Sequence, residues 1–318
     1  MQREGKDQQF HAPCALLLCT QAPTAPLCCI IPLFHLLQVG NEVMFEGIGF
    51  EMIAGLLATG VAVGLVAGLL GVGGGILMVP VFYLVNLYAY HLTESASILL
   101  AVGTSLACMV PTSISSVMAQ HRKNNIDWGL IRGWLVSLLA GVICGALLSA
   151  FKGGTWLTGL FGCIAMFVAL RMFLGANKEA KFKSLPGLIW QHVAAFFISF
   201  LSVMVGIGGG SLTPPYLTAF NVPIHKAVGS ASTVGLIICL PGAIMGILFA
   251  DTPAAAANMP GVWSVVNWLQ VLFIVPCSVI FAKLGVALGA KMNQVLLKRI
   301  FAVVLFLTAA RMLYSAFV

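Results

Sequence analysis

Two runs of three glycines are the residues of this chain best suited to bind a ligand through the backbone. They are Gly73-Gly74-Gly75 and Gly208-Gly209-Gly210, and both lie within apolar sequence. Glycine inside a helix costs about 1 kcal/mol relative to alanine, so we expect both runs to interrupt their helices. Unwinding leaves free N–H groups where the next segment begins, near Ile76 or Ser211, and such helix starts bind anions. Two helix N-termini that face each other predict a compact anion site. The alternative is that the glycine runs only allow close helix packing of the GxxxG type.

Hydroxyl side chains close to the glycine runs supply further donors. They are Thr104, Ser105, Ser211, Ser230, Ser232 and Thr233. Neutral donors hold an oxyanion weakly enough to release it, whereas a buried arginine is costly to keep within a membrane. The alternative is that each hydroxyl bonds the backbone of its own helix, as buried Ser and Thr often do. We predict that these hydroxyls and both glycine runs bind a small anionic substrate.

An internal repeat relates the two glycine runs. Residues 71–80 read GVGGGILMVP and residues 206–215 read GIGGGSLTPP, with six of ten positions identical at an offset of 135. AVGTS at 101–105 is echoed by AVGSAS at 227–232, and ALRM at 169–172 by AARM at 309–312. Three echoes in the same order indicate a duplication that covers two halves of similar length.

The elements that position these residues are predicted to be membrane helices. Of the 318 residues, 60% are hydrophobic and only 8% are charged, and the mean hydropathy is +1.04. A soluble domain carries about 25% charged residues because its surface faces water. This composition excludes a soluble enzyme and a disordered chain. The net charge of +7 comes without a basic patch interleaved with aromatic residues, so no nucleic-acid partner is expected.

Each half contains five apolar segments, most of them near the roughly 20 residues that cross a bilayer as a helix. They cover 48–70, 76–90, 95–118, 129–150 and 155–174, then 188–205, 211–222, 226–249, 264–289 and 295–317. The second segment of each half is short and contains proline, a pattern typical of the broken helices that bind substrate in transporters. The predicted fold class is an all-α polytopic membrane protein of two homologous halves, each with a short helix interrupted by glycine.

Basic residues favour an inverted arrangement of the two halves. If each half crosses the membrane five times, one side collects twelve Lys and Arg after residue 48 and the other side two, Lys152 and Arg311. If the short segments dip and return, the halves are parallel and the same residues divide eight to six. The positive-inside rule selects the inverted repeats, with the 119–128 and 176–187 loops in the cytoplasm. We expect a multi-pass protein of the cytoplasmic membrane, with the lipid bilayer as a partner.

The chain is predicted to have four parts. Residues 1–43 differ in composition from the rest, since Pro13, Pro23, Pro26 and Pro32 break every apolar run, and we expect a non-native or disordered extension. The first transmembrane repeat covers 44–175, a cytoplasmic linker covers 176–187, and the second repeat covers 188–318.

The duplicated motif resembles the sulfite exporter TauE/SafE family of membrane transporters. The likeness rests on Gly-Val-Gly-Gly-Gly with Pro80, on Ala-Val-Gly-Thr-Ser, and on their second copies, and it extends from about residue 48 to 318. It implies export of sulfite, an organosulfonate or a related sulfur-containing anion, bound between the repeats at the glycine breaks. Where the first copy has Thr104-Ser105, the second has Ser230-Ala231, and the lost hydroxyl leaves the identity of the anion open.

Two other functions remain as alternatives, an anion channel and a membrane subunit that does not itself transport. An enzyme is not expected, because the sequence has neither HExxH nor GxSxG and only one acidic residue, Asp251, after position 179. No cofactor or metal is expected either, because the nine cysteines form no CxxC pair and no Cys/His cluster at zinc spacing.

Overall fold

The computed structural model describes most of the second half of the chain and much of the first. The described residues are 55–61, 63–65, 75–152, 154–174, 185–257, 259, 261–289, 302–303, 305–307 and 309–314. The chain divides into two units, Met1–Ile48 and Gly49–Val318, and the first lies wholly outside the described residues. The expectation for residues 1–43, the bounds of the four parts, and the glycines at 73 and 74 therefore stay predictions.

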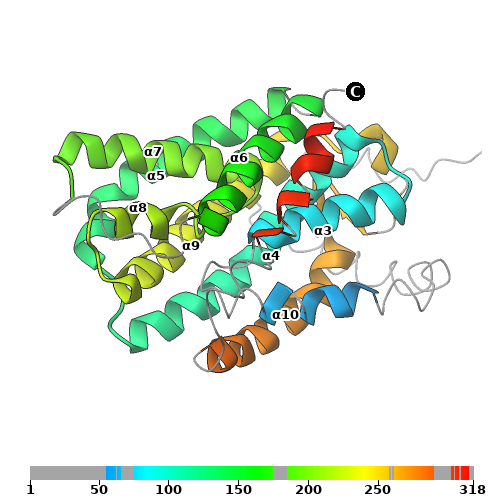
Figure 1. Ribbon diagram of the computed structural model, residues 1–318. Coiled ribbons are helices and arrows are strands. Elements are labelled where there is room, and N and C mark those ends of the chain that lie inside the picture. The colour runs from blue at the N-terminus through cyan, green and yellow to red at the C-terminus, as the bar shows by residue number, and fades with distance from the viewer. Residues whose placement is uncertain are drawn as a thin grey trace, which may run out of the picture. The chain divides into compact units, whose positions relative to one another are not determined.

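Helices make up nearly all of the described part of Gly49–Val318 (Figure 1). They are α3 (Gly75–Tyr88), α4 (Glu94–Arg122), α5 (Trp128–Lys152), α6 (Thr155–Leu174), α7 (Leu188–Val205), α8 (Thr213–Ala219), α9 (Ile224–Phe249) and α10 (Trp268–Gly289). Helical residues also occur within 55–65 and 302–314. Four of these helices, α4, α5, α7 and α9, are long and apolar enough to cross a membrane. The prediction of a mostly helical protein with several helices able to span a membrane is thus confirmed.

A short connection between α9 and α10 departs from the predicted helix over 264–289. It contains the 3-10 turn η1 (Ala254–Ala256) and two antiparallel strands, β1 (Val262–Trp263) and β2 (Val266–Asn267), with Val262 opposite Asn267. The hairpin turns at Ser264, whose φ of 57° lies in the left-handed region. The helix therefore begins only at Trp268.

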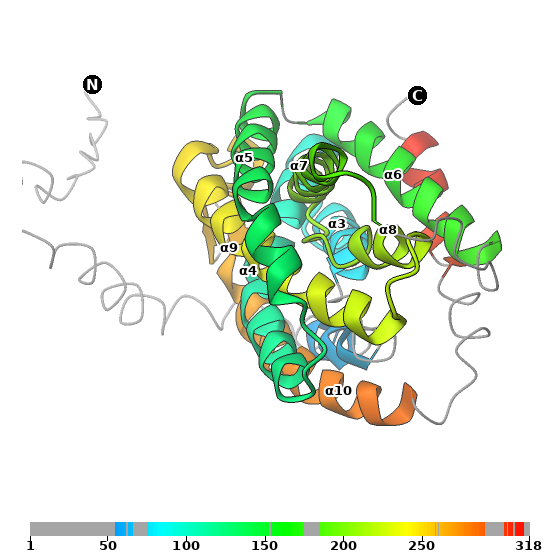
Figure 2. The same ribbon diagram turned by 90° about the vertical axis from the view of Figure 1, so that its left-hand side faces the viewer.

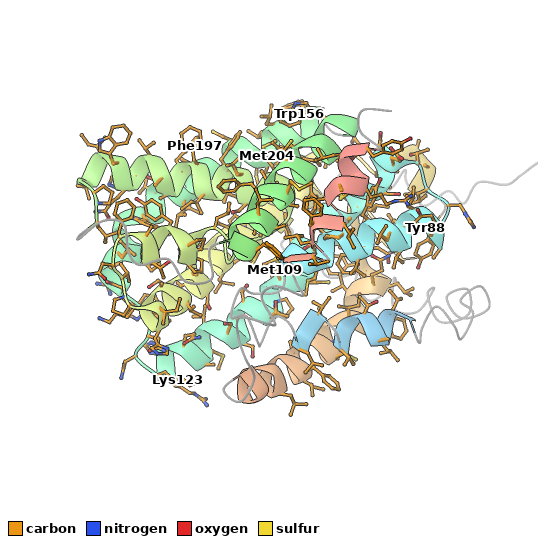
Figure 3. The ribbon with its side chains drawn as sticks, in the orientation of Figure 1. Tyr88, Met109, Lys123, Trp156, Phe197 and Met204 are labelled. Atoms are coloured by element: carbon orange, nitrogen blue, oxygen red, sulfur yellow. The ribbon has the colours of Figure 1, made fainter. Side chains whose placement is uncertain are left out.

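Large apolar side chains cover the outside of the helices. Val136 of α5 is 76% exposed and Phe197 of α7 is 54% exposed. Figure 3 shows Phe197 and Trp156 pointing away from the neighbouring helices. Such contiguous apolar exposure is unusual for a protein in water and suits contact with lipid.

Glycines let two pairs of helices pack closely. The helix α5 packs against α7, and the helical residues 55–65 pack against α10. A Cβ atom at Gly145 of α5 would lie 2.7 Å from the Phe200 carbonyl of α7, and Gly141 packs on the same helix one turn earlier. At Gly64, in the helical residues 55–65, a Cβ would lie 2.6 Å from the Ser278 carbonyl of α10. Gly141 and Gly145 meet Phe196 and Phe200 in the same order, so α5 and α7 run parallel, side by side in Figure 1.

The AVG-bearing helices of the two halves, α4 and α9, run antiparallel beside each other (Figure 2). Leu106 of α4 contacts Gly242 of α9, whereas Ser116, three turns further along α4, donates a hydrogen bond to Ser232 near the start of α9. The end of α4 and the start of α9 consequently lie at one end of the helix pair. The basic residues Arg122 and Lys123 are exposed at this end, and Figure 3 shows Lys123 there.

Candidate functional site

The second glycine run lies in the non-helical segment between α7 and α8. Residues 206–212, which we call the second break, contain three glycines with positive φ: Gly206 at 70°, Gly208 at 64° and Gly209 at 72°. Side chains other than hydrogen strongly disfavour this conformation, so only glycine passes through it without strain. Gly206 ends α7 with a left-handed cap, and α8 begins at Thr213, whose hydroxyl donates to the Gly209 carbonyl over 2.8 Å.

Several polar groups of the second break are buried without a hydrogen-bond partner among the described residues. Gly208, Gly209 and Ser211 are buried, and their backbone amides donate no hydrogen bond to another backbone group among the described residues. The Ser211 hydroxyl also lacks a hydrogen-bond partner among those residues. Buried polar groups are almost always paired, so an unpaired set of donors requires an explanation. The short helix α8 adds little dipole, and the unwound amides themselves are the candidate donors.

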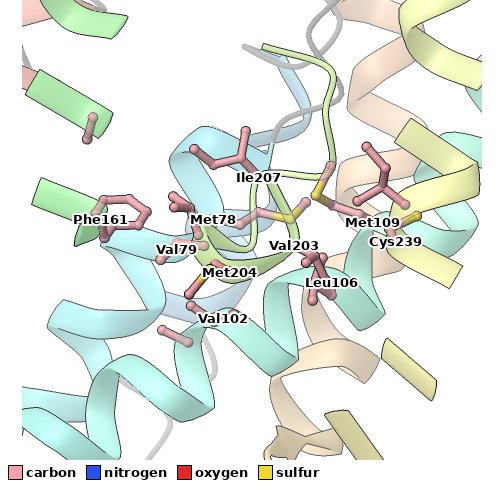
Figure 4. Close-up of a cluster of buried hydrophobic side chains, with 14 of the residues drawn as sticks. Met78, Val79, Val102, Leu106, Met109, Phe161, Val203, Met204, Ile207 and Cys239 are labelled. Carbon is pink, nitrogen blue, oxygen red and sulfur yellow. The ribbon is translucent and has the colours of Figure 1, made fainter. Parts of the chain in front are cut away.

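The second break contacts the end of the first glycine run. A Cβ atom at Gly75, the first residue of α3, would lie 2.6 Å from the Ile207 carbonyl and would collide with Met109. Met109 of α4 also packs against Gly208. Figure 4 shows Met109 and Ile207 close together, with Val203 and Cys239 around them. The start of α3 therefore meets the second break backbone to backbone.

The predicted hydroxyls occupy three different environments. Ser105 donates to the Gly206 carbonyl over 2.9 Å and so braces the second break from α4. Ser232 donates to the Val228 carbonyl of its own helix and accepts from Ser116. Thr233 is buried and its hydroxyl has no partner among the described residues. Only Ser105 and Ser211 belong to the second break by direct contact or position.

Thr104 lies at a contact that we call the Asn267 junction. The backbone N–H of Asn267 donates to the Thr104 hydroxyl over 2.9 Å, and Gly103 packs directly on the Val265 carbonyl. The Asn267 side-chain oxygen in turn accepts the N–H groups of Leu269 and Gln270 over 3.1 and 3.2 Å. Asn267 is therefore the N-cap of α10, tethered to α4 by Thr104.

Ser230 occupies the matching place at the Asp127 junction. The backbone N–H of Asp127 donates to the Ser230 hydroxyl over 3.1 Å, and Gly229 packs directly on the Asn125 carbonyl. The Asp127 carboxylate accepts the N–H groups of Gly129 and Leu130, each over 3.1 Å, and caps α5. Thr104 and Ser230 are thus hydrogen-bond acceptors in two equivalent tethers, a role that the residues alone did not reveal.

The caps themselves were missed by the sequence interpretation, although a signal was present. Asp127-Trp128 and Asn267-Trp268 each precede an apolar run, as N-caps do, and they repeat at an offset of 140. The glycine motifs repeat at 135 and the AVG motifs at 126. Because the offset changes along the chain, a two-residue echo is hard to recognise before the contacts are known.

Apolar helices long enough to cross a membrane, with large apolar side chains on their outside, define a multi-pass membrane protein. The chain belongs to the sulfite exporter TauE/SafE family, whose sequence profile matches residues 56–312.

Two curated relatives are similar over nearly their whole lengths. A protein of Haemophilus influenzae named "Probable membrane transporter protein" is 32% identical over 276 residues, which cover 83% of this chain and 98% of the relative. "Probable membrane transporter protein YunE" of Bacillus subtilis is 26% identical over 281 residues, or 82% of this chain and 97% of the relative. No solved structure was found to match the chain.

Proposed function

We propose that this protein carries a small sulfur-containing oxyanion, sulfite or an organosulfonate, across the cytoplasmic membrane, most simply as an exporter. The binding site is the second break together with the start of α3. The observation that carries this proposal is the set of buried, unpartnered donors of Gly208, Gly209 and Ser211, which lies where Gly75 meets Ile207. Such donors are satisfied by an anion that has shed its water.

The absence of an arginine among the described groups of the second break suits transport. A buried cation would bind an anion tightly and would be costly to keep unpaired when the anion leaves. Amides and hydroxyls are neutral in both states, so the empty site is stable enough to reorient. Binding and release can then alternate without a large change in electrostatic free energy.

Inverted repeats supply the geometry for alternating access. The helices α4 and α9, which carry the AVG motifs, run antiparallel. A two-fold axis in the membrane plane relates antiparallel helices, whereas an axis along the membrane normal would relate parallel ones, so the packing supports inverted repeats. Gln191 near the start of α7 accepts a hydrogen bond from Trp134 near the start of α5, which places these starts together. The exposed basic residues Arg132 and Lys226 lie near the starts of α5 and α9, at the end of the helices assigned to the cytoplasm.

Counterflow in proteoliposomes tests the proposed function. Vesicles loaded with unlabelled sulfite should accumulate labelled sulfite above its equilibrium level, because a carrier exchanges one anion for another. Sulfate and ethanesulfonate inside the vesicles measure which anions exchange. Conductance without counterflow would assign a channel instead, and no flux of any of these anions would overturn the transport proposal.

Removal of the unpartnered Ser211 hydroxyl locates the site. Ser211→Ala should raise the KM for sulfite about fivefold, since a lost hydrogen bond to an anion costs about 1 kcal/mol or more. Thr158→Val is the matched control, because Thr158 of α6 is also buried and also lacks a partner among the described residues. An unchanged KM in Ser211→Ala would place the site elsewhere.

A further inference from the structure

Beyond the second break, a contiguous group of buried amide and hydroxyl side chains surrounds the start of α10. We call Asn86, Tyr90, Ser97, Asn267 and Gln270 the amide cluster. Asn86, Ser97, Asn267 and Gln270 are each 0% exposed. They come from α3, α4, the β2 strand and α10, and Tyr90 follows α3.

A chain of hydrogen bonds fixes which way each amide points. The Asn86 Nδ2 donates to the Ser97 carbonyl over 3.3 Å, so the Asn86 Oδ1 faces the other way and accepts from the Gln270 Nε2 over 2.9 Å. The Asn267 Oδ1 is held by the two N–H groups that it caps. Neither Asn267 nor Gln270 can flip its amide without breaking these bonds.

Four polar atoms of the cluster are left without a partner among the described residues. They are the Asn267 Nδ2, the Gln270 Oε1, the Ser97 Oγ and the Tyr90 Oη. Burial raises the pKa of the Tyr90 hydroxyl, and a hydrogen-bond interaction with the Asn267 side chain offsets part of that rise. The Asn267 Nδ2 and the Tyr90 Oη therefore lie near each other, although neither atom completes a hydrogen bond within the described residues. The cluster thus offers three donors, the Asn267 Nδ2 and the two hydroxyls, and one acceptor whose orientation is fixed, the Gln270 Oε1. Leaving them all unpaired in a buried site is costly.

The surrounding helices favour an anion at this place. α4 begins three residues before Ser97, and α10 begins immediately after Asn267, so two long helices direct their positive ends toward the cluster. The Arg311 guanidinium stacks over the Tyr88 ring at 4.9 Å, two residues from Tyr90. Glu94, half-buried in the first turn of α4, is the acidic group nearest in sequence.

We propose that the amide cluster is a second binding site, for an oxyanion that also carries a hydrogen-bond donor, such as a hydroxyalkanesulfonate. The donors of Asn267, Ser97 and Tyr90 bind the oxyanion, and the Gln270 Oε1 accepts the bond from the ligand hydroxyl. Its role as a second station on the path rests on the proposed transport function, whereas binding itself does not.

Calorimetry on the purified full-length chain tests the site with two probes that differ by one hydroxyl, 2-hydroxyethanesulfonate and ethanesulfonate. The Ser211→Ala chain is the background, so that the second break contributes less to binding. We expect 2-hydroxyethanesulfonate to bind about five- to tenfold more tightly than ethanesulfonate, as one hydrogen bond predicts. Equal binding of the two probes, or no binding of either, would overturn the proposal.

Tyr90→Phe and Ser97→Ala, each added to that background, separate binding from stability. Both remove a buried hydroxyl that has no partner among the described residues, so the Tm should not fall. The Kd for 2-hydroxyethanesulfonate should rise about fivefold in each, and Thr158→Val should leave it unchanged. A Kd unaffected by either change would overturn the amide cluster as a site, and counterflow that persists at the same time would leave the transport proposal standing.

Discussion

The Asn267 and Asp127 junctions are built alike and differ in their surroundings. Each consists of a glycine packed on a loop carbonyl, a hydroxyl that accepts one N–H, and a cap that accepts two. Asn267 is completely buried, whereas Asp127 is exposed. Arg122 and Lys123, both exposed, precede Asp127 by a few residues.

This difference separates the contacts that both junctions need for stability from the polar groups that are free to bind a ligand. A carboxylate caps α5 where water solvates its charge, but the same charge at position 267 would be buried among neutral amides. Asparagine caps equally well and brings a spare N–H donor. The shared features therefore hold the halves together, and the spare donor of Asn267 belongs to the amide cluster alone.

The glycines of the two junctions should give the largest effect. In Gly103→Ala and Gly229→Ala, the new Cβ meets the backbone of Val265 or Asn125, which cannot move without shifting the loop. We expect a loss of about 1–3 kcal/mol in the free energy of unfolding for each, as in other overpacked sites. Thermal unfolding of the purified protein measures it.

Gly133→Ala is the control for both glycine variants, because a Cβ at Gly133 of α5 meets nothing within 4 Å. It should leave stability unchanged or raise it by up to about 1 kcal/mol. If one junction glycine tolerates alanine as well as Gly133 does, the two junctions are not equivalent.

The caps come next, and here the two junctions should separate. Asn267→Ala leaves two N–H groups unpaired in a buried site, and a loss of about 2 kcal/mol is expected, whereas water replaces the cap in Asp127→Ala and the loss is about 1 kcal/mol. Both values come from the same unfolding measurement. Equal losses would show that burial of the Asn267 junction has no energetic consequence.

The hydroxyl tethers should give the smallest effect. Thr104→Val removes the acceptor of the buried Asn267 N–H and should cost about 1 kcal/mol, while Ser230→Ala should cost less because the Asp127 residue is open to water. Hydrogen exchange of these two amides tests the ranking directly. Faster exchange at Asp127 than at Asn267 in the unmodified chain is expected, and the reverse order contradicts it.

The sequence was sufficient for the apolar helices because they leave local patterns. Apolar runs mark α4, α5, α7 and α9, and Gly208-Gly209-Gly210 stands out by composition alone. The contacts that give these residues their roles are distant in the chain, since Ser105 and Gly206 are 101 residues apart and Asn86 and Gln270 are 184 apart. The amide cluster draws single polar residues from separate segments, and each of them is unremarkable in its own segment.

The central claim is that an anion crosses where Gly75 meets the second break, and sulfite counterflow by Gly75→Ala tests it most directly. The added methyl group would press on Ile207 and Met109 and so displace the start of α3 from the break. The Gly75→Ala protein must still elute as a single species and keep its Tm within a few degrees. We then predict that its sulfite counterflow is at least about tenfold slower than that of Gly133→Ala. Counterflow at the rate of the unmodified protein in such a folded variant would contradict the account.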